Sequence, residues 1–143
     1  MRNLHPAILT RDQADAVLDD LRGRSIDAFG MAILGLYAGL RACEIFRLFW
    51  SNVDFEKGIL EAFHSPARPM SWQVASMLTE RRPKDASSFD YVFPAPGSQW
   101  EFYNGDRVGS TYTRCFRRLG ISNATFRSFQ LTHAAWAKEA SRA

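Results

Sequence analysis

The sequence predicts a mainly helical α+β domain with a small antiparallel β-sheet. Apolar residues recur at helical spacing over most of the 143 residues, and a segment between residues 51 and 70 breaks this pattern with turn formers and prolines. The chain is 46% hydrophobic and 23% charged, near the averages for soluble globular proteins. We therefore expect a single domain over residues 1–143, and the composition excludes a disordered tail, a coiled coil and a fibrous chain.

The first predicted helix covers about residues 11–22. Thr10 has the features of an N-cap because Gln13 stands at the third helical position, as in a capping box, and Gly23 is expected to close the helix. The next apolar run, residues 26–40, is long enough for a buried helix and carries Ala, Leu and Met. We expect this second helix at the centre of the core.

Gly39 stands where the C-cap of that second helix is expected. A third helix is predicted over residues 41–49, which places Arg41 at a junction between two helices. Residues 51–58 combine turn formers with two acids, and residues 59–63 are expected to form a short strand.

The rest of the chain is predicted to return from sheet to helix. A hairpin with a proline-containing connection fits residues 64–70, because proline is tolerated at sheet edges and in turns. A helix is expected over residues 72–80, and the polar residues 81–88 form the best candidate for an exposed linker. Two further helices are predicted over about residues 107–119 and 125–140.

Charge is unevenly distributed along the chain. Residues 1–72 carry 8 Lys or Arg against 9 Asp or Glu, a net charge of −1, and residues 73–143 carry 10 against 6, a net charge of +4. One stretch contains basic residues and no acid: Arg107, Arg114, Arg117, Arg118, Arg127 and Lys138. Such a stretch is typical of a surface that faces a phosphate backbone, and a solvated helix face explains the same charges equally well.

The sequence favours a soluble, cytoplasmic protein. The weakly polar residues 29–40 are too few to span a bilayer, and the N-terminal MRNLHPAIL lacks the long apolar stretch and cleavage site of a signal peptide. Cys43 and Cys115 have no metal-site spacing, so we expect both to be reduced packing residues.

No metal or cofactor is predicted. The histidines are scattered without ligand spacing at His5, His64 and His133. Most aromatic residues fall in helical runs and are expected in the core, whereas Trp100 and Tyr103 lie in a loop and stay open as base-stacking candidates.

The order of several segments resembles the catalytic domain of tyrosine recombinases, also called phage integrases. The segments are ILTRDQADAVLDDL, AILGLYAGLRACEIFRLFWSNVDFEKGIL, YVFP, the basic helix ending RRLGI, and ATFRSFQLTHAAWAKEAS. The second is the most specific, being similar to the family's T-G-L-R-x-x-E turn, Leu-x-Trp, and Asp before a first strand. The resemblance spans nearly the whole chain and implies that domain's fold, double-stranded DNA as partner, and a role in DNA recombination or integration.

Family chemistry indicates which residues to inspect. In the enzymes a tyrosine attacks a DNA phosphodiester, two arginines hold the scissile phosphate, and a lysine protonates the leaving 5′-hydroxyl. Arg41 falls on the first of these arginines, and Glu44 on the acid that fixes the helix start. From the residues alone, the favoured explanation of Arg41 is a junction arginine paired with Glu44 or one whose stem packs while its head reaches solvent, whereas the resemblance favours an arginine that faces phosphate.

The second catalytic box departs from the family pattern. The preferred register puts Arg127 at the first histidine, Gln130 at the second arginine and Leu131 at the following histidine or lysine. A shifted register that matches His133 to the last histidine does not restore the histidine and arginine pair either. Gln130 donates hydrogen bonds without charge, and Leu131 neither donates nor titrates.

Two further catalytic groups are missing. No lysine lies between Lys57 and Lys84, and Arg68, the only cation near the expected hairpin, is a poor proton donor. The family's tyrosine would lie beyond Ala143, and the chain is expected to lack both that nucleophile helix and the N-terminal DNA-gripping domain.

These observations favour a catalytically inactive, DNA-binding module of a mobile element or prophage. Beside Arg41, the residues expected on phosphate are Arg68, Arg107, Arg114, Arg117 and Arg118. A second copy of the chain or a recombinase is a further possible partner. No membrane is expected as a partner. Two alternatives stay open: a protein-interaction or homodimerising module that no longer binds DNA, and an active recombinase that receives its tyrosine from another chain.

Overall fold

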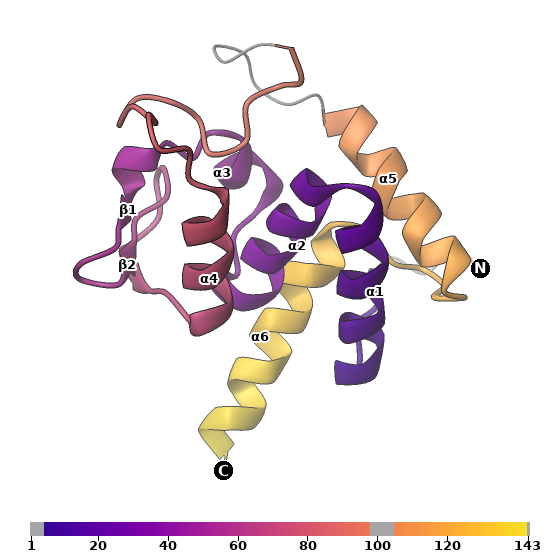
Figure 1. Cartoon of the computed structure of the whole chain (residues 1–143). Coiled ribbons are helices and arrows are strands. Elements are labelled where there is room, and N and C mark those ends of the chain that lie inside the picture. The colour runs from indigo at the N-terminus through magenta and orange to yellow at the C-terminus, as the bar shows by residue number, and fades with distance from the viewer. Residues whose placement is uncertain (1–4, 98–104, 143) are drawn as a thin grey trace.

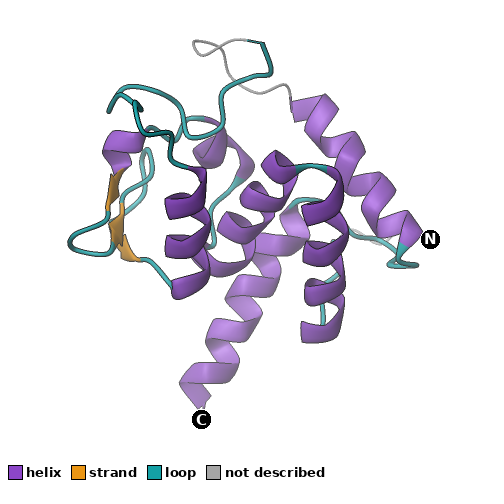
Figure 2. Ribbon diagram, in the orientation of Figure 1, coloured by secondary structure: helices purple, strands orange, loops and turns teal. Residues whose placement is uncertain are grey.

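The structure is a computed structural model that describes residues 5–97 and 105–142 (Figure 1). These residues form six α-helices and three short strands, mainly helical as predicted (Figure 2). The helices are α1 (Arg11–Arg24), α2 (Ile26–Ala38), α3 (Ala42–Phe46), α4 (Trp72–Arg81), α5 (Gly105–Arg118) and α6 (Arg127–Arg142), and the strands are β1 (Val53–Asp54), β2 (Ile59–Leu60) and β3 (Arg68–Pro69). Within the described residues, no helix is both long and apolar enough to cross a membrane.

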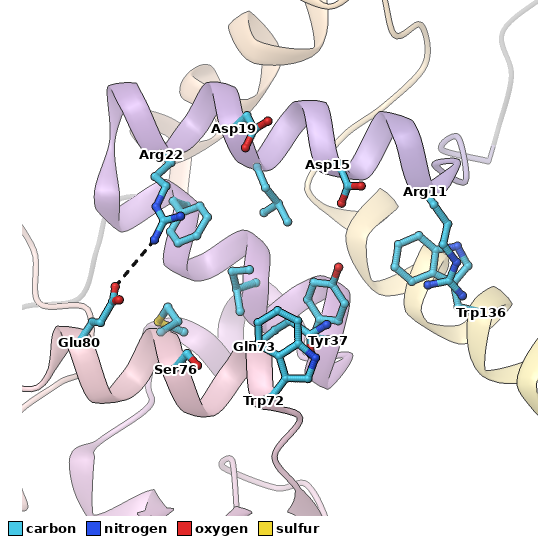
Figure 3. A pocket seen from close by; sticks show the side chains of 14 residues that line it. Arg11, Asp15, Asp19, Arg22, Tyr37, Trp72, Gln73, Ser76, Glu80 and Trp136 are labelled. Carbon is cyan, nitrogen blue, oxygen red and sulfur yellow. Dashed lines mark ion pairs between the residues drawn. The ribbon is translucent and has the colours of Figure 1, made fainter.

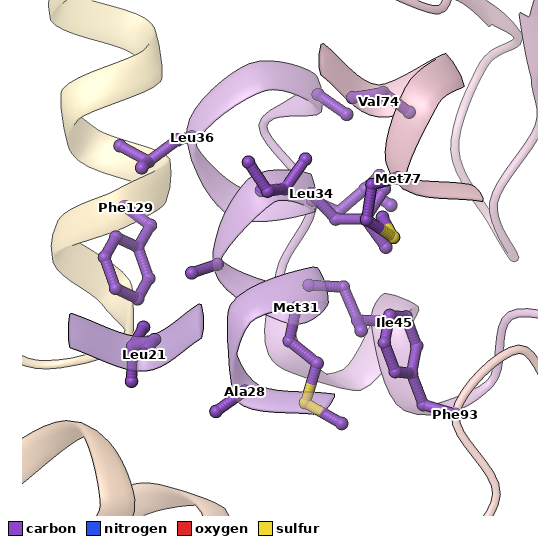
Figure 4. Packing of buried hydrophobic residues seen from close by; sticks show 14 of the residues in the cluster. Leu21, Ala28, Met31, Leu34, Leu36, Ile45, Val74, Met77, Phe93 and Phe129 are labelled. Atoms are coloured by element: carbon purple, nitrogen blue, oxygen red, sulfur yellow. The ribbon is translucent and has the colours of Figure 1, made fainter. Parts of the chain in front are cut away.

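Helix α2 forms the centre of the core, as predicted from its apolar sequence. It packs between α1 and α4, with α6 against a further side (Figure 1). Leu34 and Leu36 are fully buried; Phe129 of α6 lies beside Leu36, and Leu34 lies on the side of Val74 and Met77 (Figure 4). The close approach of α6 requires Gly35, because a Cβ there would lie 2.7 Å from the Cβ of Phe129.

The caps of the first two helices follow local sequence chemistry. Thr10 Oγ1 accepts from the Gln13 amide at 3.0 Å and Gln13 Oε1 accepts from the Thr10 amide at 3.0 Å, so the predicted capping box is confirmed. Gly23 does not end α1 as predicted. The helix continues to Arg24, because Ser25 supplies the next cap by accepting from the Ala28 amide at 3.2 Å.

The second helix ends where the sequence predicts. Gly39 is its C-cap, with a φ of 69° in the left-handed region that favours glycine. The helix after it is shorter than the predicted residues 41–49, since α3 ends at Phe46. The chain then extends so that Phe49 forms an isolated bridge with Tyr91.

The sheet is antiparallel with the order β1-β2-β3, which places the predicted hairpin between β2 and β3. Leu60 lies opposite Val53 on one side and Arg68 on the other. The strand is shorter than the predicted residues 59–63, and β1 was not predicted because its residues lie among turn formers. Pro69 occupies an edge strand, where its missing N–H is tolerated.

Candidate nucleic-acid interface

Arg41 lies where α2 ends and α3 begins. Its backbone is extended, with φ −80° and ψ 159°, so it acts as the N-cap residue of α3. The Arg41 amide donates to Glu44 Oε1 at 2.8 Å, and Arg41 Nε lies 3.7 Å from the same oxygen. The Arg41 side chain is nevertheless 67% exposed, so the guanidinium pairs with Glu44 and still faces solvent.

Glu44 is a buried carboxylate that fixes this junction. It is 7% exposed, and its second oxygen, Oε2, accepts a hydrogen bond from the Ser65 hydroxyl in the connection between β2 and β3. A buried carboxylate is tolerated only when its oxygens have donors, and both oxygens of Glu44 have one. The start of α3 is thus attached to the sheet.

The start of α6 meets the same junction. Arg41, Arg127 and Gln130 line one cavity of about 440 Å³, together with Leu40, Ala42, Cys43 and Phe126. The structure therefore brings Arg41 of the first motif together with Arg127 and Gln130, two of the three residues that the preferred register places in the second box; Leu131, the third, does not line the cavity. Burial of Phe129 against α2 holds this end of α6, and the Thr125 amide donates to Ser128 Oγ at 3.1 Å just before the helix.

The cavity has the chemistry of an anion site. Arg127 is exposed, and among the described residues neither it nor Gln130 pairs with a carboxylate. Two guanidinium groups can hold the oxygens of a phosphate by charge-assisted hydrogen bonds, and the amide of Gln130 adds a neutral donor. The positive end of the α6 dipole adds to the same field.

His133 lies outside this cavity. Its Nδ1 is 2.8 Å from the carbonyl oxygen of Leu36, and its ring packs against Gly39, where a Cβ would lie 2.6 Å from His133 Cδ2. His133 lines a neighbouring cavity of about 340 Å³ with Arg68. The histidine of the shifted register is therefore a packing residue at the end of α2, and Leu131, which is half-buried, adds no polar group.

Arg68 is also occupied within the fold. From β3 its Nη1 donates to the carbonyl oxygen of Ala38, one of the carbonyls at the end of α2 that lack helical partners. Arg68 does not line the cavity of Arg41. The only cation predicted near the hairpin thus stabilises the α2 terminus.

The basic helix α5 presents its arginines in different ways. Arg114 and Arg117 are exposed, and no carboxylate of the described chain pairs with them. Arg118 instead binds Asp20 of α1 through two hydrogen bonds, Nη2 to Oδ2 at 2.6 Å and Nε to Oδ1 at 3.2 Å. The hydrogen bond from Arg118 lowers the pKa of Asp20 from 3.8 to about 2. The side chain of Arg107 lies outside the described part, as do Trp100 and Tyr103.

Two residues of the site were not predicted from sequence. Cys43 was predicted to be a packing residue, but it is exposed and lines the cavity; its position two residues after Arg41 is the only signal that could have placed it there. Ser65 is the partner of Glu44 from 21 positions away, and no local pattern indicates such a contact.

Comparison with solved structures finds close matches in fold. No protein-family model matches the sequence, and no curated protein is similar to it in sequence. The XerA recombinase superposes with a TM-score of 0.80 at 16% identity, over 99% of this chain and 52% of that one. The Tn1549 transposon integrase in complex with circular intermediate DNA matches with a TM-score of 0.77 at 15% identity, over 96% of this chain and 54% of that one.

A third match is the lambda integrase, residues 75–356, bound to DNA, with a TM-score of 0.73 at 15% identity, over 94% of this chain and 51% of that one. The described helices and three-stranded antiparallel sheet are thus the catalytic-domain fold of tyrosine recombinases. The chain spans about half the length of the structures it matches.

Proposed function

We propose that this chain is a DNA-binding module with a recombination- or integration-related role, in the cytoplasm, encoded by a mobile element or prophage. The observation that supports it best is the cavity that Arg41, at the junction of α2 and α3, lines together with Arg127 and Gln130 from the start of α6. Phosphates of double-stranded DNA are the ligands that suit two exposed guanidinium groups in this fold.

Exposed arginines on α5 extend this proposal. Arg114 and Arg117 are exposed and unpaired among the described residues, so they can neutralise phosphates without breaking an internal contact. The resulting binding is independent of base sequence and weakens as the salt concentration rises, because phosphate contacts release counterions.

The same residues argue for a catalytically inactive protein. Gln130 has no charge to stabilise a transition state, and Leu131 has no proton to give. No lysine lies between Lys57 and Lys84, and Arg68 is bound to the end of α2. We therefore assign this chain a binding role, in which it forms a homo-oligomer on DNA or joins an active recombinase there.

The test is fluorescence anisotropy of a labelled duplex over a range of salt concentrations. Arg41→Ala and Arg127→Ala should each weaken binding about tenfold, because each removes a charge-assisted contact worth roughly 1.5 kcal/mol. Each should also reduce the slope of the logarithm of the binding constant against the logarithm of the salt concentration by about one, the value for one lost phosphate contact. Arg142→Ala is the matched control, since it removes an exposed arginine from the far end of α6.

Two results would contradict the proposal. Absence of binding at low salt, or equal effects of Arg41→Ala and Arg142→Ala, would remove the phosphate-binding role from the cavity. A covalent adduct between the chain and a nicked DNA substrate, seen on a denaturing gel, would contradict the assigned inactivity.

A further inference from the structure

A second hollow lies between α1 and α4, over α2, and has a volume of about 610 Å³ (Figure 3). No residue that lines it also lines the cavity of Arg41. We call it the α1/α4 groove. Its floor is α2, since both flanking helices pack against α2.

The groove has the length of a short helical segment. Phe29, Ile33 and Tyr37 follow one another along its floor at intervals of four residues. Eight residues of helix extend ~12 Å, which is about two turns. Arg22 and Glu80 close one end with an ion pair at 3.9 Å.

Trp136 of α6 closes the other end, with the guanidinium carbon of Arg11 4.2 Å from the centre of its ring. The groove is therefore bounded at both ends and open along its top (Figure 3).

Large apolar side chains form the floor and part of the α4 wall of the groove. Phe29 and Tyr37 are half-buried on the floor, and Met77 adds a buried flexible side chain from α4. Trp72 stands at the edge with 75% of its surface exposed. A large aromatic residue next to a preformed apolar groove marks an interaction surface.

The charged residues that line the groove are three acids and two arginines, a net charge of −1, although the chain as a whole carries +3. Two of the acids belong to the α1 wall. Asp15 and Asp19 stand one helical turn apart on this wall, and neither forms an ion pair with a described residue. The two arginines of the groove are already engaged, Arg22 with Glu80 and Arg11 with Trp136. The contact with Trp136 leaves the positive charge of Arg11 in place, so Asp15 and Asp19 exceed the remaining positive charge of the groove by one.

Burial raises the pKa of Tyr37; the charge of Asp15 adds to that rise and the charge of Arg11 opposes it, which agrees with a carboxylate close to the floor of the groove. A ligand with positive charge on one flank would neutralise this carboxylate and Asp19 together.

We propose that the α1/α4 groove binds an amphipathic helix of a partner protein. About two turns of bulky apolar residues lie on the α2 floor, and Lys or Arg on one flank lies beside Asp15 and Asp19. This is the helix-in-groove mode of recognition, in which apolar anchors supply affinity and flanking charges select the partner.

A second copy of this chain fits the groove less well. In the described chain the exposed large apolar residues are scattered over helix starts, loops and one helix end: Ile8, Ile26, Phe63, Trp72, Phe89 and Leu119. No described helix carries several of them on one face, so none offers the apolar stripe that the groove requires. Duplex DNA is disfavoured too, because Asp15 and Asp19 repel phosphates.

The test uses two labelled peptides with helix-favouring sequences of three turns and Leu at positions i, i+4 and i+7. One peptide carries Lys on the flanks of this stripe and the other carries Glu. Anisotropy should show that the Lys peptide binds at least about tenfold more tightly than the Glu peptide. Quenching or a spectral shift of tryptophan fluorescence should accompany binding, since Trp72 and Trp136 border the groove.

Three variants locate the binding. The double variant Asp15→Asn with Asp19→Asn should reduce the preference for the Lys peptide about tenfold. Trp72→Ala should weaken the binding of both peptides without unfolding the chain, because Trp72 is exposed. Glu56→Gln with Glu139→Gln is the control, since it removes two exposed acids outside the groove. Circular dichroism confirms that each variant is folded.

Failure of both peptides to bind would overturn the proposal, as would a preference for Lys that survives Asp15→Asn with Asp19→Asn. Sedimentation equilibrium tests the remaining candidate occupant, a second copy of this chain. A dimer that Trp72→Ala dissociates would assign the groove to a second copy of this chain and also overturn the proposal.

Discussion

Glu44 determines how Arg41 is presented. Its two oxygens accept from the Arg41 amide and from the Ser65 hydroxyl, so one buried side chain joins the start of α3 to the connection between β2 and β3. The Arg41 guanidinium is left exposed at the cavity because the carboxylate engages mainly the backbone of that residue. The acid in the motif is thus a structural residue that serves the site indirectly.

Removal of this acid should therefore cost stability. In Glu44→Ala the Arg41 amide and the Ser65 hydroxyl lose their acceptors, which should lower the free energy of unfolding by about 1–3 kcal/mol. Urea unfolding followed by circular dichroism measures this. Glu56→Ala, which removes an exposed acid, should leave the midpoint in place, and equal midpoints for the two variants would contradict this role of Glu44.

The two cysteines should differ in reactivity. Burial raises the pKa of the Cys115 thiol to about 12, so its thiolate is scarce near neutral pH, whereas Cys43 is exposed. A disulfide reagent should titrate one thiol rapidly in the folded protein and both in urea. Cys43→Ser should abolish the rapid phase, and a rapid phase that persists in this variant would show that Cys115 is accessible.

Among the elements, helices with strong local signals were predicted best. The capping box at Thr10 and the left-handed turn at Gly39 place the start of α1 and the end of α2, since both depend on neighbouring residues. The bridge of Phe49 to Tyr91 shortens the third helix, and pairing with β2 forms a strand among turn formers. These differences depend on contacts distant in sequence, which periodicity does not detect.

The same limit applies to the candidate site. Arg41 was identifiable from its motif, but its placement in one cavity with Arg127 depends on the packing of α6 against α2. Arg118 was predicted to contact phosphate because it lies in a basic segment, but in the structure it binds Asp20, 98 positions away. Charge in a sequence indicates an ion pair or a ligand site only after the fold shows which carboxylates are near.

Helix α5 therefore contains neighbouring arginines with different roles. Arg117→Ala should weaken DNA binding and leave stability unchanged, because its side chain is exposed and unpaired in the described chain. Arg118→Ala should lower the thermal midpoint, since it removes the closer of the two arginines that pair with Asp20, the other being Arg24. Melting curves and anisotropy on both variants test this, and the reverse order of effects would contradict it.

The contact between α1 and α5 also predicts a pH dependence. The folded pKa of Asp20 is about 2 and its ordinary value is 3.8, so this carboxylate contributes stability above pH 3.8 and loses it as the pH falls toward 2. Asp20→Asn should be less stable than wild type at neutral pH, and the difference should shrink over this acidic range. Thermal melts at successive pH values measure it; a constant difference would exclude Asp20 as the source.

The whole molecule is organised around α2, and both proposed binding surfaces depend on this helix. Its C-terminal end leads into Arg41, its side facing α6 sets the position of Arg127, and its stripe of Phe29, Ile33 and Tyr37 forms the floor of the α1/α4 groove. The lining of the groove carries a net charge of −1, whereas the cavity is lined by Arg41 and Arg127 and by no acid. One helix thus supports two surfaces whose net charges have opposite signs.

The contact of α2 with α6 should therefore control the cavity as a unit. Gly35→Ala adds a Cβ that would lie 2.7 Å from the Cβ of Phe129, so α6 must shift, and we expect a loss of about 1–3 kcal/mol in unfolding free energy. Because α6 bears Arg127 and Gln130, DNA binding should weaken even at temperatures where the variant is folded. Gly109→Ala is the control, since a Cβ there meets no atom within 4 Å. If Gly35→Ala lost stability but bound DNA as tightly as Gly109→Ala, phosphate binding would not require the arrangement of Arg41 and Arg127 across α2 and α6.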